Sequence, residues 1–167
     1  VGKDFGVYDL TIDTNQANTP AIPLMNPISL FSAHVRATIQ NVKILAFKGT
    51  DVGGIFDLLG QEDTISFNHI ENGQGANSEG IYIFQTSNST FQGNYIDTMG
   101  REGFYLADST DGTGTSGDNK FIGNTVVNTG AEAFDARCIN DIFSGNIIKN
   151  CVNGFYLTAP KNTVIGN

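Results

Sequence analysis

Phe91-Gln92-Gly93-Asn94-Tyr95-Ile96 is one copy of a pattern that recurs along the chain. The pattern is an apolar residue, two further residues, Asn, one residue and a second apolar residue. Other copies begin at Ile65, Phe121 and Phe143, and a fifth begins at Val164 and ends on its Asn. The asparagines of the five copies are separated by 26, 30, 22 and 21 residues; they are Asn68, Asn94, Asn124, Asn146 and Asn167. A motif at intervals of about 20 to 50 residues is typical of solenoids and other repeat architectures.

A second motif runs between these copies: a small residue, an apolar residue, Tyr or Asp, and another apolar residue. Its copies are Gly80-Ile81-Tyr82-Ile83, Gly103-Phe104-Tyr105-Leu106, Ala133-Phe134-Asp135-Ala136 and Gly154-Phe155-Tyr156-Leu157. Ile55-Phe56-Asp57-Leu58 fits as a weaker earlier copy. A second polar column follows the asparagines four places later, at Asn72, Thr98, Asn128 and Asn150.

Each unit alternates apolar and other residues over a few positions, which is the period of a short strand rather than of a helix. Strands this short bury their apolar side chains by stacking on the next copy. We therefore predict an all-β fold, a parallel β-helix, in which the side-chain amide of each Asn bonds its copy in the neighbouring coil. The predicted interior columns are Phe56, Ile81, Phe104, Phe134 and Phe155, and Leu58, Ile83, Leu106, Ala136 and Leu157.

Composition excludes several classes of protein. The 167 residues are 40% hydrophobic, enough for a sizeable core, so a charge-rich disordered chain is excluded. Nine Lys and Arg against 17 Asp and Glu, without a basic cluster, argue against a nucleic acid partner, because phosphate binding needs cations. No stretch approaches the apolar length of a membrane span, so we expect no membrane insertion.

These repeats resemble the pectate-lyase-like superfamily of right-handed β-helices, whose coils carry Asn-x-Ile and Gly-Ile-x-Leu signatures. Leu10-Thr11-Ile12-Asp13 and the order of repeats resemble in particular the catalytic modules of mannuronan C5-epimerases and phage tailspike depolymerases. The resemblance implies a single right-handed β-helix over residues 1–167, with about six to seven coils. Neither end carries a cap, so we expect a piece of a longer protein, with further domains of the same chain or a homotrimer as alternatives.

The second motif predicts an outward column, because side chains alternate between the two faces of a strand. Its members are Asp57, Tyr82, Tyr105, Asp135 and Tyr156. Aromatic rings stack on sugar rings while hydroxyl groups and carboxylates meet their polar edges, so the column is a candidate substrate-binding surface for a polysaccharide. The alternative is that solvent-facing Tyr is ordinary in strands.

Charged residues near this column are the candidate catalytic groups. Arg137 follows Asp135 on the same strand and either forms a surface ion pair or binds the carboxylate of a uronic acid. A glutamate precedes the small residue in three consecutive coils, at Glu79, Glu102 and Glu132. These carboxylates either form an acid/base pair, bind Ca²⁺, or point to water.

Several reactions are compatible with these residues. For a lyase or epimerase, Tyr105 or Tyr156 would act as base and acid and Arg137 would neutralise the uronate. For a hydrolase, the carboxyl pairs are Glu102 with Glu132, or Asp135 with Glu132 or Asp108. Asp57 and Asp135 are predicted to lie three coils apart, about 14 Å, which is too far for a hydrolytic pair.

The sequence departs from the families it resembles. Asp57-Leu58-Leu59 stands where epimerases have Asp-Pro-His, and the paired Asp and Gly-His-Gly patterns of pectin hydrolases are missing. His69 is predicted to face outward on another sheet, and Cys138 and Cys151 to be small core residues without a disulfide. The long polar loop over residues 108–118 is predicted to be flexible, and its three Asp lack the spacing of a Ca²⁺ loop.

The functional expectation is an extracellular, cell-surface or virion-associated β-helix that binds a polysaccharide and cleaves or epimerises it. The enzyme would be a polysaccharide lyase, a uronan C5-epimerase or a glycoside hydrolase. The alternative is a non-catalytic structural or adhesive segment, such as a tailspike shaft or an adhesin. We assign no metal ligands; Ca²⁺ is the one cofactor left open.

Overall fold

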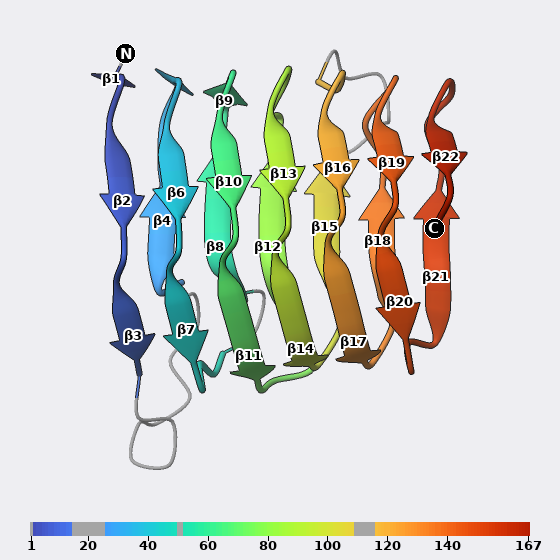
Figure 1. Ribbon diagram of the computed structural model, residues 1–167, viewed down its shortest axis with the longest axis horizontal. Helices are drawn as coiled ribbons and strands as arrows, with labels where there is room; N and C mark the ends of the chain where they lie inside the picture. Colours follow the sequence, from blue (N-terminus) through green and yellow to red (C-terminus); the bar gives the residue numbers. More distant parts are fainter. Residues whose placement is uncertain (1, 15–25, 50–51, 109–115) are drawn as a thin grey trace.

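Short parallel strands, wound as successive coils, make up the computed structural model, which describes residues 2–14, 26–49, 52–108 and 116–167. The coils lie side by side from the N-terminal end of the molecule to the C-terminal end (Figure 1). The strand pairings of the four sheets are all parallel between consecutive coils, as the sequence predicts. Among these residues, no helix has the length and apolar character of a membrane crossing. Residues 109–115 of the predicted loop lie outside the described residues.

Three long sheets form the walls of the coil, and a short sheet closes one corner near the N-terminal end. Sheet I consists of β2 (Gly6–Tyr8), β6 (Thr38–Gln40), β10 (Thr64–Ser66), β13 (Thr90–Gln92), β16 (Lys120–Ile122), β19 (Ile142–Ser144) and β22 (Thr163–Ile165). Sheet II consists of β3 (Thr11–Asp13), β7 (Lys43–Leu45), β11 (His69–Gly73), β14 (Tyr95–Met99), β17 (Thr125–Thr129) and β20 (Ile147–Lys149). Sheet III consists of β4 (Ile28–Leu30), β8 (Val52–Leu58), β12 (Ser78–Phe84), β15 (Phe104–Ala107), β18 (Glu132–Ala136) and β21 (Asn153–Leu157). The short sheet consists of β1 (Gly2–Lys3), β5 (His34–Val35) and β9 (Gly60–Gln61).

Residues with a left-handed backbone make the corners between the sheets. The corner between sheets I and II is Gly in four consecutive coils, with φ between 60° and 64°; these are Gly93, Gly123, Gly145 and Gly166. The predicted second polar column forms the corner after sheet II, with φ between 54° and 58°; its members are Asn72, Thr98, Asn128 and Asn150. Gly and Asn tolerate this conformation best, which explains why the chain is rich in both.

The predicted Asn ladder is confirmed. Nδ2 of Asn94 donates to Oδ1 of Asn124 at 3.0 Å, and the same bond links Asn124 to Asn146 at 3.0 Å. The bonds from Asn68 to Asn94 and from Asn146 to Asn167 complete the series. Each Oδ1 also accepts the backbone N–H of the preceding rung, for example Asn94 N–H to Asn124 Oδ1 at 3.0 Å. The ladder therefore satisfies buried backbone groups at the corner, where the strands provide no partner.

A second ladder lies at the start of the strands of sheet I, whereas the Asn ladder follows their ends. The residues of the second ladder do not form a recognisable sequence motif. Its rungs are Asp63, Ser89, Asn119, Asp141 and Asn162, and each accepts a backbone N–H from the preceding coil at 2.7–3.1 Å. Within each coil a second-ladder rung precedes an Asn-ladder rung by five residues, with a strand of sheet I between them. Side chains that bond backbone groups therefore connect neighbouring coils at both ends of the strands of sheet I.

The core contains two stacks of phenylalanine rings. Phe104, Phe134 and Phe155 stack as predicted, with centroids 4.9 and 5.1 Å apart and interplanar angles of 4° and 10°. The stack from sheet I consists of Phe91, Phe121 and Phe143, with centroids 4.8 Å apart. The two stacks meet edge to face at 5.3–6.4 Å, an arrangement that aromatic rings favour.

The earliest predicted members of the interior columns are wrong by one residue. Ile55 pairs with Ile81, so Ile55 rather than Phe56 occupies the first column, and Asp57 rather than Leu58 occupies the second. Gly54 takes the place of the small residue of the motif, and a Cβ there would lie 2.7 Å from Ile70 Cγ2 in the core. The corrected register is 26 residues per coil, equal to the spacing between the first two ladder asparagines.

Candidate functional site

Four of the predicted residues share one column on the outer face of sheet III. Tyr82 pairs with Tyr105, Tyr105 with Asp135, and Asp135 with Tyr156 in consecutive coils. The predicted alignment of these side chains is therefore confirmed. Tyr156 is 50% exposed, whereas Asp135 is 2% exposed beneath its neighbours.

Asp57 does not belong to this column, which corrects the prediction of a substrate-binding Asp57. It pairs with Ile83 inside the coil, is 0% exposed, and lies beside the imidazole of His34. Asp57 therefore cannot contact a substrate on the outer face.

Aromatic rings continue the column toward the N-terminal end. Phe56 takes the outward place that the sequence assigned to Asp57 and lies 4.9 Å from the ring of Tyr82. Phe31 lies 5.3 Å from Phe56 and is 63% exposed, and Tyr82 lies 4.9 Å from Tyr105. The outer face of sheet III thus carries a row of four aromatic rings in mutual contact.

Two guanidinium groups lie over the ring of Tyr105. The Cζ atoms of Arg101 and Arg137 are 5.4 and 5.1 Å from its centroid, within the range of cation–π interactions. Burial raises the pKa of Tyr105, so its hydroxyl group stays protonated at neutral pH and acts as a hydrogen-bond donor. Tyr156, two coils further along the same column, is 50% exposed.

Arg137 holds Asp135 through two hydrogen bonds. Nε donates to Oδ1 at 3.2 Å and Nη2 to Oδ2 at 2.9 Å, which is the bidentate geometry of strong Arg–carboxylate pairs. The predicted neighbourhood of these two residues is confirmed. The pair fixes the guanidinium over Tyr105, and the Arg137 side chain stays 41% exposed.

Arg101 lies among the predicted glutamates, and sequence reasoning missed it. Its Nε is 2.7 Å from Glu102 Oε1, and its Nη1 is 3.8 Å from Glu79 Oε1. Both carboxyl groups are 1% exposed, so Arg101 supplies the positive charge that buried acids require. Glu132 accepts a hydrogen bond from Asn153 at 2.9 Å, and Asp108 is buried just beyond β15. The signal in the sequence was Arg101 itself, directly before Glu102.

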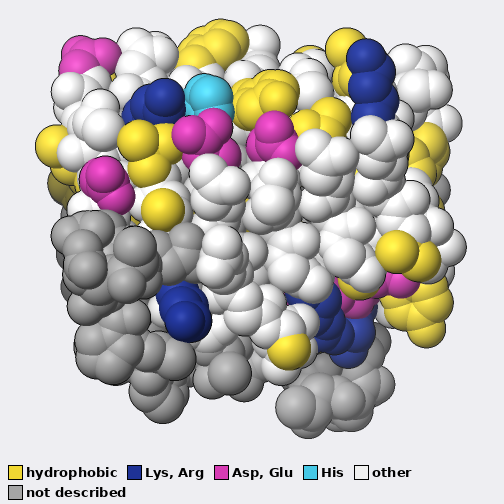
Figure 2. All heavy atoms as spheres, turned by 90° about the horizontal axis from the view of Figure 1, so that it is seen from below, with side chains coloured by type: hydrophobic (Ala, Val, Ile, Leu, Met, Phe, Trp, Pro, Cys, Tyr) yellow, Lys and Arg dark blue, Asp and Glu magenta, His cyan; other side chains and the backbone are white. Residues whose placement is uncertain are grey.

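Burial raises the pKa of Glu102 to about 7, and the negative charges of Asp135 and Glu132 act in the same direction, against the opposing effect of Arg101. Glu102 Oε2 has no hydrogen-bond partner among the described residues. Near neutral pH this carboxyl group is therefore present in both protonation states, which is the property of a general acid or base. In the face seen from below, acidic and basic side chains lie next to each other in two places, one in the upper part of the view and one at lower right (Figure 2).

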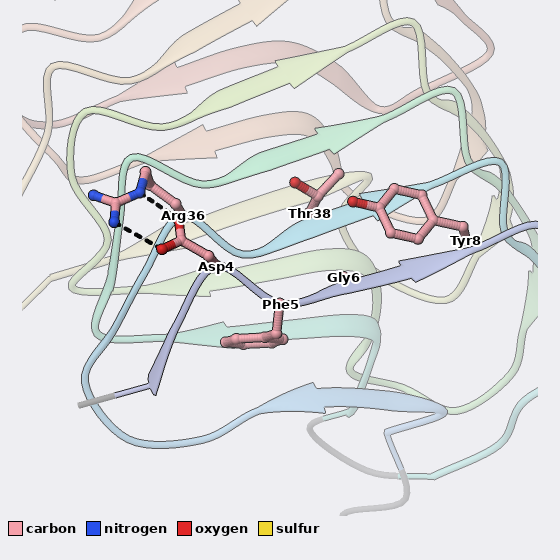
Figure 3. Close-up of a pocket in the computed structure, with 6 residues that line it drawn as sticks. All are labelled: Asp4, Phe5, Gly6, Tyr8, Arg36 and Thr38. Carbon is pink, nitrogen blue, oxygen red and sulfur yellow. Dashed lines mark hydrogen bonds and ion pairs between the residues drawn. The ribbon is translucent and has the colours of Figure 1, made fainter.

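The remaining predictions concern residues away from this face. His69 lies on sheet II as expected, with Nε2 2.8 Å from Glu71 Oε2, and Cys138 and Cys151 are free thiols. A shallow pocket of about 410 Å³ lies near the N-terminal end, where Asp4 and Arg36 form an exposed ion pair (Figure 3). Its charged groups neutralise each other and lie apart from the tyrosine column.

One group of described residues has the donor atoms of a metal site: His34, Asp57 and Asp63, all buried inside the coil. In the absence of an ion, burial lowers the pKa of His34, but the nearby Asp57 carboxylate, the Ser32 carbonyl and the charges of both aspartates outweigh it and raise the pKa to about 9. The carboxylates thus have a protonated imidazole between them.

Comparison with known proteins gives the family. The family model described as a right-handed β-helix region matches residues 24–167. No curated protein and no solved structure matches the chain. The match covers most of the sequence and agrees with the stacked parallel sheets, whereas the likeness to epimerases and tailspikes stays a prediction. The chain belongs to the right-handed β-helix family.

Proposed function

We propose that the outer face of sheet III binds a polysaccharide chain, centred on the Tyr105 cluster, which we define as Arg101, Glu102, Tyr105, Asp135 and Arg137. The observation that carries the proposal is the pair of guanidinium groups on one tyrosine ring beside a buried carboxyl group with a pKa of about 7. The six strands of sheet III span about 24 Å, enough for several sugar rings in an extended chain.

The cluster favours a glycan that carries carboxylates. Arg137 is 41% exposed and presents the outer edge of a planar donor group, which suits a uronate. Arg101 lowers the pKa of Glu102, so a substrate carboxylate that draws Arg101 away favours the protonated form of Glu102. Glu102 is 1% exposed, so it would reach a substrate only after Arg101 has been drawn away. It would then donate a proton to the glycosidic oxygen, or in its ionised form remove the C5 proton of the uronate.

A structural or adhesive role is the second candidate, and one observation favours it. Arg137 is bound twice by Asp135, and Arg101 is bound by Glu102, so the charges of the cluster are already paired within the chain. A surface of this kind can stabilise a shaft without binding a ligand. Both roles imply an extracellular, cell-surface or virion location, because polysaccharides and adhesion partners are met there.

The test is binding and turnover with a panel of uronate and neutral polysaccharides. We expect Tyr156→Ala to weaken glycan binding about five- to thirtyfold, because it removes the most exposed tyrosine ring of the column. Tyr95→Ala is the matched control: Tyr95 is 37% exposed on the outer face of sheet II and should leave binding unchanged. Equal effects of the two changes, or no binding to any glycan, would refute the proposed binding surface.

Catalysis is separated from binding by Glu102→Gln, which keeps the size of the side chain. A lyase gives new ultraviolet absorbance from an unsaturated sugar, a hydrolase gives new reducing ends, and an epimerase changes the sugar signals in NMR spectra. Glu102→Gln should abolish such a product while the affinity stays within a factor of about three. Binding without any product from the wild-type chain would support the structural or adhesive role.

A further inference from the structure

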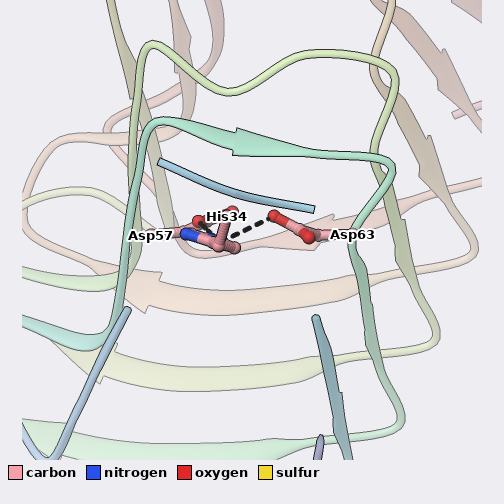
Figure 4. A group of neighbouring side chains, drawn as sticks. All are labelled: His34, Asp57 and Asp63. Atoms are coloured by element: carbon pink, nitrogen blue, oxygen red, sulfur yellow. Dashed lines mark ion pairs between the residues drawn. The ribbon is translucent and has the colours of Figure 1, made fainter. Parts of the chain in front are cut away.

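The buried cluster at the short sheet lies inside the coil, and the proposed polysaccharide-binding face of sheet III does not use it. His34 comes from β5, Asp57 from β8 and Asp63 from the residues before β10. Their exposed fractions are 3%, 0% and 1%. The imidazole points between the two carboxylates, with Nε2 3.0 Å from Asp57 Oδ1 and 2.9 Å from Asp63 Oδ2 (Figure 4).

Hydrogen bonds around the cluster fix which atoms face its centre. His34 Nδ1 lies 2.8 Å from the Ser32 carbonyl oxygen, which can only accept, so Nδ1 carries a hydrogen. Asp63 Oδ1 accepts the Ala37 N–H at 2.7 Å, which leaves Oδ2 for the centre. His34 Nε2, both oxygens of Asp57 and Asp63 Oδ2 have no well-directed hydrogen bond among the described residues. Three buried polar atoms, His34 Nε2, Asp57 Oδ1 and Asp63 Oδ2, therefore converge without a well-directed hydrogen bond. A metal cation bound among them would take the place of the proton on Nε2 and neutralise the buried carboxylates.

Gly60 keeps this space open. It pairs with His34 in the short sheet, and its N–H points to Thr86 Oγ1 at 3.4 Å. A Cβ at Gly60 would overlap the Asp63 carboxylate and lie 2.7 Å from Asp57 Oδ1 and 3.0 Å from His34 Nε2. The three atoms nearest to that position are the same three donor atoms that face one another across the cluster.

We propose that His34, Asp57 and Asp63 form a structural binding site for a divalent first-row transition ion, with Zn²⁺ as the best fit. One imidazole nitrogen and two carboxylate oxygens are ligands that Zn²⁺ takes, and they fill three of its four tetrahedral positions. Tetrahedral bonds of about 2.0–2.1 Å put ligand atoms about 3.3 Å apart. The distances of 2.9 and 3.0 Å need only a small widening. The imidazole disfavours Ca²⁺ and Mg²⁺, which take oxygen ligands.

The hydrogen bond at the other ring nitrogen of His34 supports the same assignment. Histidines that bind metals usually donate their other ring N–H to a backbone carbonyl or a carboxylate, as His34 does to Ser32. His34 belongs to one coil, and Asp57 and Asp63 belong to the next, so the ion ties two consecutive coils together. Its role would be to stabilise the N-terminal coils.

The test uses the chain without a histidine tag, stripped with a chelator and then refolded with or without Zn²⁺, because the site is closed to solvent. We expect one Zn²⁺ per chain by elemental analysis and a rise in Tm of about 5 to 10 °C at a hundredfold excess over the dissociation constant. Co²⁺ should bind in its place and give the visible absorption of a four- or five-coordinate ion. Ca²⁺ at the same concentration should leave Tm unchanged.

Two variants locate the ion. Asp57→Asn keeps the shape of the side chain, removes one ligand charge, and should weaken Zn²⁺ binding at least tenfold. His69→Gln is the matched control, since His69 also lies 2.8 Å from a carboxylate but is on the surface and faces one acid. A wild-type chain that refolds without taking up Zn²⁺ or showing Co²⁺ absorption overturns the site, as does binding that depends on His69. If Asp57→Asn does not fold, the wild-type Co²⁺ spectrum decides.

Discussion

Replacing Asp141 by Asn should stabilise the protein at pH 8. Asp141 is a rung of the second ladder and is 0% exposed. Its Oδ1 accepts the Asn119 N–H at 3.0 Å, but its Oδ2 has no hydrogen-bond partner among the described residues. The rungs on either side are Asn119 and Asn162, whose Nδ2 groups donate to backbone carbonyls at 3.1 and 3.0 Å. We expect the amide of an Asn at position 141 to make the same bond.

The magnitude follows from the pKa of the carboxyl group. Burial raises the pKa of Asp141 from an ordinary value of 3.8 to about 7, against the opposing Asn119 hydrogen bonds. The folded state thus binds this proton more tightly than the unfolded state, so the stability is greatest below pH 4 and falls as the pH rises through 7. With about 1.4 kcal/mol per pKa unit, Asp141 costs about 4 kcal/mol at pH 8 and about 1.5 kcal/mol at pH 5.

The assay is thermal or denaturant unfolding of both proteins at pH 5 and pH 8. The advantage of Asp141→Asn should grow by about 2.5 kcal/mol between the two pH values, and at pH 8 its Tm should be about 10 °C higher. Asp118→Asn is the control, because it removes the same charge from an exposed neighbour and should change stability by less than about 0.5 kcal/mol. An advantage that is equal at both pH values, or a loss of stability at pH 8, would contradict the argument.

Three further substitutions test the packing. Asn124→Ala should cost about 3 kcal/mol or more in denaturant unfolding, because it leaves buried groups of two neighbouring coils unpaired; a cost below 1 kcal/mol would argue against the ladder. Phe134→Ala opens a cavity between two stacked rings and should cost about 3 to 5 kcal/mol by the same measurement, and a smaller cost would mean that the stack collapses freely. Gly80→Ala should lower stability by about 1 to 3 kcal/mol, because the added Cβ would lie 2.5 Å from Ile96 Cγ2. The reverse change at the equivalent position of another coil, Ala133→Gly, should cost less than about 1 kcal/mol. Equal costs would show that the structure relaxes around the added Cβ.

The features that could be predicted from the sequence are those in which geometry demands one residue type. The amide of Asn both donates and accepts, so a ladder with side-chain bonds needs the same residue in every coil, and Asn94 or Asn124 is easily recognised. Stacked Phe104 and Phe134 recur for a similar reason, since like rings fill like spaces. The tyrosine column followed from the alternation of side chains along a strand.

The features that could not be predicted are those in which several residue types serve equally. The second ladder needs only an oxygen that accepts an N–H, and Asp63, Ser89 and Asn119 all provide one. Asp57 in an apolar column makes sense only beside His34, which lies in the preceding coil. The misplacement of Asp57 was avoidable, because the 26-residue spacing of the asparagines also fits Gly54 and Gly80.

The two ladders also determine where the chain is free to change length. Successive rungs of both ladders are separated by the same series of 26, 30, 22 and 21 residues. The segment from one ladder to the other across sheet I is thus constant, and every added or deleted residue falls in the part of the coil that contains sheets II and III. Evolution or an engineer can therefore graft new loops around the tyrosine column of one coil without shifting the register of its neighbours. A protein built this way can acquire new binding specificities by changing the loops next to sheets II and III, while the stacked strands and ladders stay the same.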